Sequence, residues 1–93
     1  MVRYAFDTSF ARSLKRFTPL QQLDIKQRVE FFIRALEAHQ LPAGFGLTRL
    51  APKLWEIRCG LAQRVLCWRI DDEIRFTFVG NHNEVRRFLK HVR

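Results

Sequence analysis

The sequence predicts a small single domain of the α+β class, with a strand, a helical hairpin, three antiparallel strands and a final helix. Apolar residues recur at helical spacing through residues 10–36, and they alternate with polar residues between residues 54 and 79. Nine Phe, two Trp and one Tyr among 93 residues supply the large side chains that one modest core needs. We therefore expect one domain over residues 1–93, with any functional site on the surface of its core.

The chain is expected to open with a strand. Val2, Tyr4 and Phe6 alternate with Arg3 and Ala5, which is the period of a half-buried strand. This first strand should contribute one apolar face to the core.

Two helices are expected next, arranged as a hairpin. The run Asp7-Thr8-Ser9 offers capping oxygens ahead of a short basic helix, and Thr18-Pro19 is a typical start for a second, longer helix that ends near His39. The apolar positions that mark the two helices are Phe10, Leu14, Phe17, Ile25, Val29, Phe32, Ile33 and Leu36.

The second half of the chain predicts an antiparallel sheet. Residues 41–46 contain Pro and Gly and form a loop, and strands are expected at Leu54–Cys59, Arg64–Ile70 and Ile74–Val79. Asp71-Asp72 is the turn between the last two strands. The final helix should begin near His82 or Asn83, with an apolar side formed by Val85, Phe88, Leu89 and Val92.

The pairing register of the first two of these strands can be predicted from chemistry. If Arg58 lies opposite Arg64, then Ile57 faces Val65 and Trp55 faces Cys67, an all-apolar set that can pack on the helices. A shift by one residue would place charge among those apolar side chains. The opposite face then carries Glu56, Arg58, Arg64, Leu66 and Trp68. Two opposed arginines repel each other, so this register favours an anion between them.

The charge of the chain predicts an anionic partner. Seventeen Lys and Arg against nine Asp and Glu give a formal net charge of +8. Nucleic acid is the first partner that such an excess indicates, and an acidic protein is the second.

The two cysteines and the N-terminus predict a reducing, cytoplasmic location. Cys59 and Cys67 lie in apolar strand-like runs without metal-ligand spacing, which favours buried free thiols. Asp7 comes before an apolar signal segment could form, and no stretch approaches membrane-spanning length, so no membrane partner is expected.

No metal or cofactor is expected. The acidic residues are scattered, and Glu84 is the one residue near His82 in the sequence whose side chain could bind a metal ion with it. Gly44-Phe45-Gly46 lacks the further Gly and the Lys of a phosphate-binding loop, and it precedes a strand rather than following one.

The element order and the run LWEIRCGLAQRVLCWRIDDEIRFTFVGNHNEV resemble the RelE/ParE superfamily of bacterial toxins from type II toxin–antitoxin modules. The shared parts are an aromatic-x-aliphatic-basic strand, a second strand with an early Arg, an acidic turn, and an aliphatic strand that closes on Gly and a polar or basic cluster. The resemblance spans essentially the whole chain. RelE-like members cut mRNA in the ribosomal A site, whereas ParE-like members inhibit DNA gyrase.

The resemblance implies catalytic roles for three residues. Arg58 matches a strand Lys or Arg that RelE-like enzymes use near the scissile phosphate, and Arg64 matches the phosphate-stabilising Arg. His82 lies where RelE-like sequences place a catalytic Arg and YafQ-like sequences place a catalytic His. The sequence departs from RelE at Glu56, where RelE has Lys, and in the last helix, which has Arg86-Arg87-Phe88 where several relatives use a Tyr.

Further residues are expected to contact RNA. Lys53, Arg86 and Arg87 are candidate phosphate contacts. Trp68 is predicted either to stack on a base or to belong to the core, and Glu56 either to act as a base or to pair with an arginine. His39 and His91 are expected to be solvent-facing residues at helix ends.

Three functions are therefore weighed. The first is a metal-independent endoribonuclease toxin that cuts mRNA, presented by the ribosome, to stop translation. The second is a ParE-like, non-enzymatic inhibitor of gyrase. The third is a degenerate toxin that acts only in a complex of antitoxin and operator DNA. All three imply an acidic cognate antitoxin that covers the basic face, with operator DNA reached only through that antitoxin.

Overall fold

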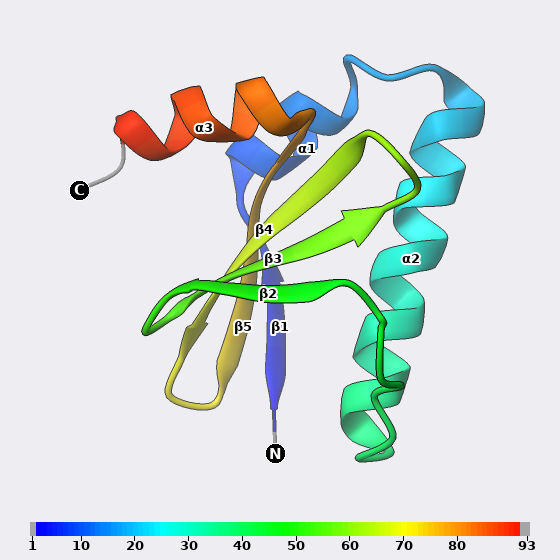
Figure 1. The fold of residues 1–93 in the computed structure, drawn as a ribbon, viewed down its shortest axis with the longest axis vertical. Helices are drawn as coiled ribbons and strands as arrows, with labels where there is room; N and C mark the ends of the chain where they lie inside the picture. The colour runs from blue at the N-terminus through cyan, green and yellow to red at the C-terminus, as the bar shows by residue number, and fades with distance from the viewer. Residues whose placement is uncertain (1, 92–93) are drawn as a thin grey trace.

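The computed structural model describes residues 2–91 as a sheet with helices on both faces (Figure 1). The elements follow in the order β1 (Arg3–Phe6), α1 (Thr8–Leu14), α2 (Pro19–Glu37), β2 (Leu47–Ala51), β3 (Leu54–Cys59), β4 (Gln63–Ile70), β5 (Glu73–Gly80) and α3 (His82–Lys90). The predicted α+β class and element order are confirmed, and β2 is an additional strand that the sequence analysis did not predict.

The sheet has the strand order β1-β5-β4-β3-β2. Strands β2 to β5 form an antiparallel meander, and β1 joins β5 in parallel. The predicted register is confirmed, because Arg58 pairs with Arg64 and Ile57 pairs with Val65. The turn at Asp71 is also where the sequence placed it, and Asp71 has a φ of 55°.

Strand β2 was not predicted because its sequence does not show the alternation of apolar and polar residues that is typical of a strand. Its five residues, LTRLA, are exposed or half-buried, and it pairs with β3 alone at one edge of the sheet. An edge strand buries little apolar surface, so its sequence needs no strict alternation.

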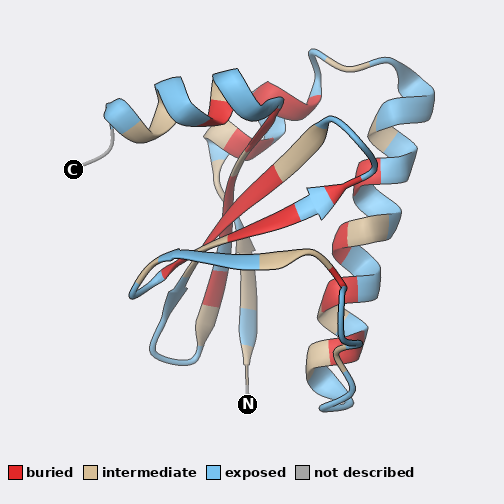
Figure 2. Cartoon of the chain, viewed as in Figure 1, coloured by how far each residue is buried: buried red, intermediate tan, exposed pale blue. Residues whose placement is uncertain are grey.

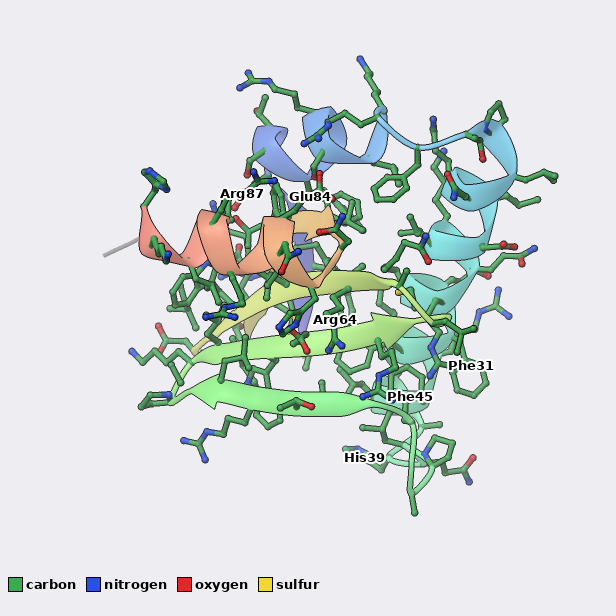
Figure 3. The ribbon with its side chains drawn as sticks, turned by 45° about the horizontal axis from the view of Figure 1, so that its top comes forward. Phe31, His39, Phe45, Arg64, Glu84 and Arg87 are labelled. Atoms are coloured by element: carbon green, nitrogen blue, oxygen red, sulfur yellow. The ribbon has the colours of Figure 1, made fainter. Side chains whose placement is uncertain are left out.

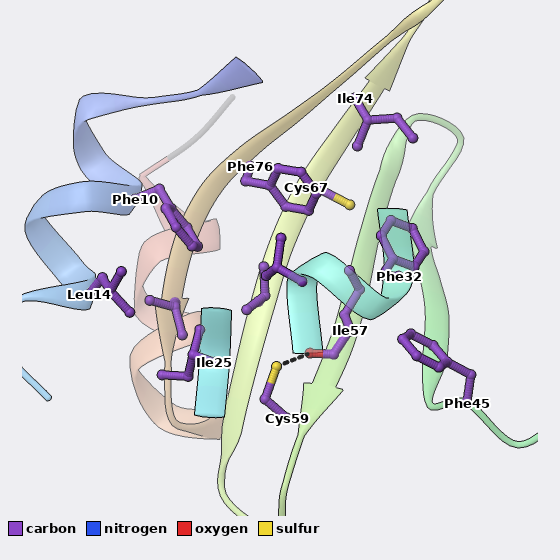
Figure 4. Packing of buried hydrophobic residues seen from close by; sticks show 13 residues of the cluster. Phe10, Leu14, Ile25, Phe32, Phe45, Ile57, Cys59, Cys67, Ile74 and Phe76 are labelled. Atoms are coloured by element: carbon purple, nitrogen blue, oxygen red, sulfur yellow. Dashed lines mark hydrogen bonds between the residues drawn. The ribbon is translucent and has the colours of Figure 1, made fainter. Parts of the chain in front are cut away.

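The main core lies between the sheet and the two helices α1 and α2 (Figure 4). Phe76, Ile57 and Val65 are fully buried on this face of the sheet, against Phe10 of α1 and Phe32 of α2. Burial of this apolar surface is the main stabilising contribution to the fold.

A second, smaller core lies on the opposite face, under α3. It consists of Leu54, Leu66 and Val85, with Trp68, Phe78, Phe88, Leu89 and Ala51 packed around them. Val85 is the buried residue of α3, and Figure 2 shows the remainder of this helix as half-buried or exposed. Trp68 is therefore half-buried in this core, which is one of the two predicted roles. Val92, predicted on the apolar side of this helix, lies outside the described residues.

The helix starts are set by capping residues. Thr18 and Asn81 each form a capping box, with Gln21 and Glu84 respectively. Asp7 occupies the corresponding position of α1, but its carboxylate bonds to the Arg75 guanidinium of β5, 3.2 Å away, in place of the helix. Helix α1 ends at Leu14, one turn earlier than the apolar pattern through Phe17 had predicted.

No helix within residues 2–91 has both the length and the apolar character to cross a membrane.

Candidate functional site

Two predicted arginines, Arg58 and Arg64, come together in one row across the sheet. Arg58 of β3 pairs with Arg64 of β4, and Arg64 pairs with Gly80 of β5. Side chains of residues paired in this way project from the same face of a sheet. Arg58 and Arg64 are therefore neighbours, and His82 follows two residues after the end of the row.

Arg64 is fixed by an ion pair with Glu56. Its Nη1 donates to Oε1 of Glu56 at 2.7 Å, diagonally across β3 and β4, and the two side chains are 22% and 10% exposed respectively. Nε of Arg64 is buried and has no hydrogen-bond partner among the described residues. The ion pair with Glu56 thus fixes the position of this guanidinium at the surface of the sheet.

Arg58 is held through its backbone. Its N–H donates to the carbonyl of Gly46 at 3.0 Å, and its own carbonyl accepts from Nε of Arg28 at 3.1 Å. Its exposed side chain makes no ion pair within residues 2–91. A fixed backbone with an unpaired guanidinium leaves Arg58 able to contact an anion.

Arg28 of α2 ties this end of β3 to the preceding loop. Its Nη2 also donates to the carbonyl of Phe45, and its Cζ lies 3.9 Å from the centroid of the Phe45 ring. Phe45 stacks in turn on Phe31 and Phe32, as Figure 3 shows for the first of these. Gly46, with a φ of +95°, approaches Arg58 so closely that a Cβ on it would lie 3.1 Å from the Arg58 Cβ.

The start of α3 is fixed just beyond Gly80. The Asn81 side chain accepts from the Glu84 N–H at 2.8 Å, and Oε1 of Glu84 accepts from the Asn81 N–H at 2.9 Å. A Cβ on Gly80 would lie 2.9 Å from the Glu84 Cβ and from the Phe78 ring, so only Gly fits there without a shift. His82, the first residue of α3, is exposed on a rigid backbone.

Helix α1 anchors the end of β5 that leads into this site. A bulge places Thr77 between the pairs Leu66–Phe78 and Cys67–Phe76. The Ser9 hydroxyl donates to the Thr77 carbonyl, and the Ser13 hydroxyl accepts from the Val79 N–H at 3.0 Å. These bonds give partners to backbone groups of β5 beyond Phe76, where the pairing of β5 with β1 ends.

The remaining predicted residues do not join the row. Lys53 and Trp68 lie at the other end of β3 and β4, about 17 Å and about 13 Å along their strands from Arg58 and Arg64. Arg86 and Arg87 are exposed on α3. Figure 3 shows Arg87 and Glu84 on the side of α3 away from Arg64, where Glu84 pairs with Arg16 of α1 at 2.7 Å.

Two positioning residues were missed by the sequence analysis. Arg28 bonds to backbone carbonyls, and Arg16 bonds to Glu84 across 68 positions of sequence. Neither contact has a sequence signal, because both depend on how helices dock on the sheet. His39 and His91 are exposed at helix ends, as predicted.

The site combines an ion-paired arginine, an arginine that makes no ion pair within residues 2–91 and a carboxylate, and an exposed imidazole lies at the start of α3. Among the described residues, no three His, Cys, Asp or Glu side chains gather in a way that could hold a metal ion. Cys59 and Cys67 are free, buried thiols, and burial raises the pKa of each to about 12. Thiols held neutral in this way are poor nucleophiles.

No protein-family model and no curated protein matches the sequence. Among known structures, a copper-bound mutant toxin from Helicobacter pylori matches with a TM-score of 0.68 and 18% identity, over 91% of this chain and 99% of that chain. YafQ from E. coli matches with a TM-score of 0.68 and 12% identity, over 91% and 98%. The RelB–RelE antitoxin–toxin complex from Methanococcus jannaschii matches with a TM-score of 0.69 and 17% identity, over 90% and 96%. The chain therefore has the fold of the RelE and YafQ toxins.

Proposed function

We propose that this protein is the toxin of a type II toxin–antitoxin module and that it cleaves mRNA without a metal ion. The observation that carries the proposal is the row formed by Arg58, Arg64 and Gly80, with His82 two residues after Gly80 in the chain. The fold shared with toxins supports the first part of the proposal, and the residues of this row support the second.

In metal-independent RNA cleavage the ribose 2′-hydroxyl attacks the adjacent phosphate, and this reaction needs three kinds of group. A base takes the proton of the 2′-hydroxyl, an acid protonates the leaving 5′ oxygen, and cations stabilise the charge that develops on the phosphorus oxygens. The guanidinium groups of Arg58 and Arg64 suit the last role, because they stay charged and present several donors in one plane. The exposed side chain of Arg58, which makes no ion pair within the described residues, supports this assignment for Arg58.

His82 is the proposed proton-transfer group. It is exposed, it begins a capped helix, and an imidazole has two ring nitrogens that can serve as proton donor and acceptor. Glu56 is the alternative base, but its ion pair with Arg64 at 2.7 Å favours a positioning role.

The site is an open surface, so we propose that another body presents the RNA. The proposed body is the ribosome, which holds mRNA in its A site, and the proposed location is therefore the cytoplasm. Arg86 and Arg87 on α3 are proposed as additional RNA contacts. Because the chain carries a net charge of +8, an acidic antitoxin is the proposed partner that covers the site and connects the toxin to operator DNA.

The test is to induce the protein without its antitoxin and to follow methionine and thymidine incorporation together. Arrest of methionine incorporation first, with new 5′ ends appearing in mRNA, is the expected result. Early loss of thymidine incorporation with gyrase–DNA complexes would instead establish the ParE-like function. Normal growth at full expression would indicate the degenerate toxin.

A further inference from the structure

The face of the sheet opposite the candidate site holds an apolar cavity that the proposed function does not use. It has a volume of about 240 Å³ and lies between the C-terminal half of α2, the following loop and the sheet. Its walls include Leu36, Leu41, Leu47, Trp55 and Ile74, and Arg69 is the one charged residue among the described residues that line it.

A second feature lies at the same end of the sheet. The hydroxyl of Tyr4 is buried and has no hydrogen-bond partner within residues 2–91. Tyr4, Ile74 and Arg69 form one row across β1, β5 and β4, so their side chains project from the face that carries the cavity. A buried hydroxyl without a partner costs free energy, which an acceptor brought by a ligand would recover.

The charges around this cavity favour an anion. Arg69 belongs to its wall, and the guanidinium of Arg49 lies 6.0 Å from the centroid of the Trp55 ring. Burial and the Glu37 carboxylate raise the pKa of Tyr4, while Arg69 lowers it, so one carboxylate and one guanidinium both act on this hydroxyl. Two guanidinium groups against one carboxylate leave a positive surplus.

The size of the cavity favours a single side chain over a cofactor. Pockets for drug-sized ligands span about 300–1,000 Å³, and this cavity is smaller. Single bulky side chains that fill a pocket are the usual anchors of protein interfaces.

We propose that this cavity receives one bulky apolar side chain of an acidic polypeptide, whose neighbouring carboxylate pairs with Arg69 and accepts a hydrogen bond from Tyr4. The partner thereby contacts the face of the sheet that is remote from Arg58 and Arg64. This inference rests on the cavity alone and holds whether or not the protein cleaves RNA.

Three capped tetrapeptides test the proposal by NMR titration up to 10 mM. The first has Phe flanked by Glu residues, the second has Ala in place of Phe, and the third has Lys in place of Glu. Saturable shifts are expected at the Trp55 indole N–H and at Leu47 and Ile74 with the first peptide. The other two should bind at least tenfold more weakly.

Two variants and one control assign the contacts. Arg69→Glu should weaken binding of the first peptide at least tenfold, whereas Arg12→Glu, an equal charge change at an exposed site on α1, should leave it within twofold. Tyr4→Phe should weaken binding about fivefold while leaving the melting temperature equal or higher, because it removes an unpartnered hydroxyl.

Three outcomes would overturn the proposal. They are no shift at 10 mM, shifts that depend on peptide charge but not on Phe, and binding of 3-phenylpropionate with no binding of any peptide. The last of these would assign the cavity to a small amphipathic acid.

Discussion

Glu56 and Arg64 form a largely buried ion pair, with 2.7 Å between Oε1 and Nη1, in the strand pair where two arginines face each other. Arg58 and Arg64 would repel each other across β3 and β4. The Glu56 carboxylate offsets this repulsion and orients Arg64, so a cation can be kept at the site without a bound anion.

Replacing Glu56 by Gln should lower the free energy of unfolding by about 1–3 kcal/mol, because Arg64 would keep its charge in a largely buried position without a counterion. Urea denaturation of both proteins measures this difference. Glu30→Gln is the matched control, since its pair with Arg34 is exposed on α2 and should contribute less than about 0.5 kcal/mol. Equal losses in the two variants would contradict a special role for the Glu56 pair.

Arg64→Ala should reduce single-turnover RNA cleavage by about 10²–10³, the loss typical for one donor that stabilises transition-state charge. Growth arrest after induction should disappear as well. Circular dichroism of the variant must show an intact fold. A folded Arg64→Ala protein with full activity at equal expression would refute the proposed site.

His82→Gln should slow the chemical step by about 10²–10⁴ with little change in RNA binding, because glutamine can hydrogen-bond but cannot transfer a proton. His91→Gln, at the far end of the same helix, is the control and should keep the wild-type rate. Weaker binding with an unchanged rate at saturation would make His82 a contact residue.

Gly80→Ala should destabilise the protein by about 1–3 kcal/mol, since the new methyl group meets Glu84 and Phe78 at 2.9 Å and must push α3 away. Cleavage should fall with it, because His82 moves with the helix. Gly44→Ala is the comparison, with a positive φ of +77° but nothing within 4 Å of the added carbon. If α3 resonances move in Gly44→Ala but not in Gly80→Ala, the close contact at Gly80 is not what fixes the helix.

Because its two thiols are buried, the protein should lose free energy of unfolding at alkaline pH. Native pKa values of about 12 exceed the ordinary thiol value of 9.0 for both Cys59 and Cys67. The unfolded chain therefore ionises first, and the free energy of unfolding should fall as the pH rises from about 9 toward about 12. Chemical denaturation between pH 7 and pH 10.5, at about half-unit steps, measures how steeply the free energy of unfolding falls with pH. The Cys59→Ala/Cys67→Ala double variant should show a shallower fall. Identical slopes in the two proteins would exclude the thiols as its cause.

The sequence predicted those parts of the fold that depend on burial. The register of β3 on β4 followed from keeping Ile57 and Val65 together and away from charge, and the structure has that register. Strand β2 was not predictable in this way, because Leu47–Ala51 buries little on either face.

The candidate site was predictable in outline but not in its supporting contacts. Because side chains alternate between the two faces of a strand, the sequence placed Glu56, Arg58 and Arg64 on one face. The repulsion between the two opposed arginines predicted an anion between them. The structure supplies the Glu56 carboxylate. Arg28 could not have been found, since its role depends on the distance between α2 and the end of β3, and no local pattern encodes that distance.

The parallel pairing of β1 with β5 has a consequence for biosynthesis. Residues 3–6 must wait for residues 73–76 before they gain a hydrogen-bonding neighbour, so this pairing has high sequence separation, whereas β2, β3 and β4 each pair with the next strand in the chain. Loop closure over such a length is slow compared with forming a helix or a hairpin. While the chain is still growing on the ribosome, Arg64 lacks the strand that ends at Gly80, and the site cannot assemble until β5 has been translated and has left the exit channel.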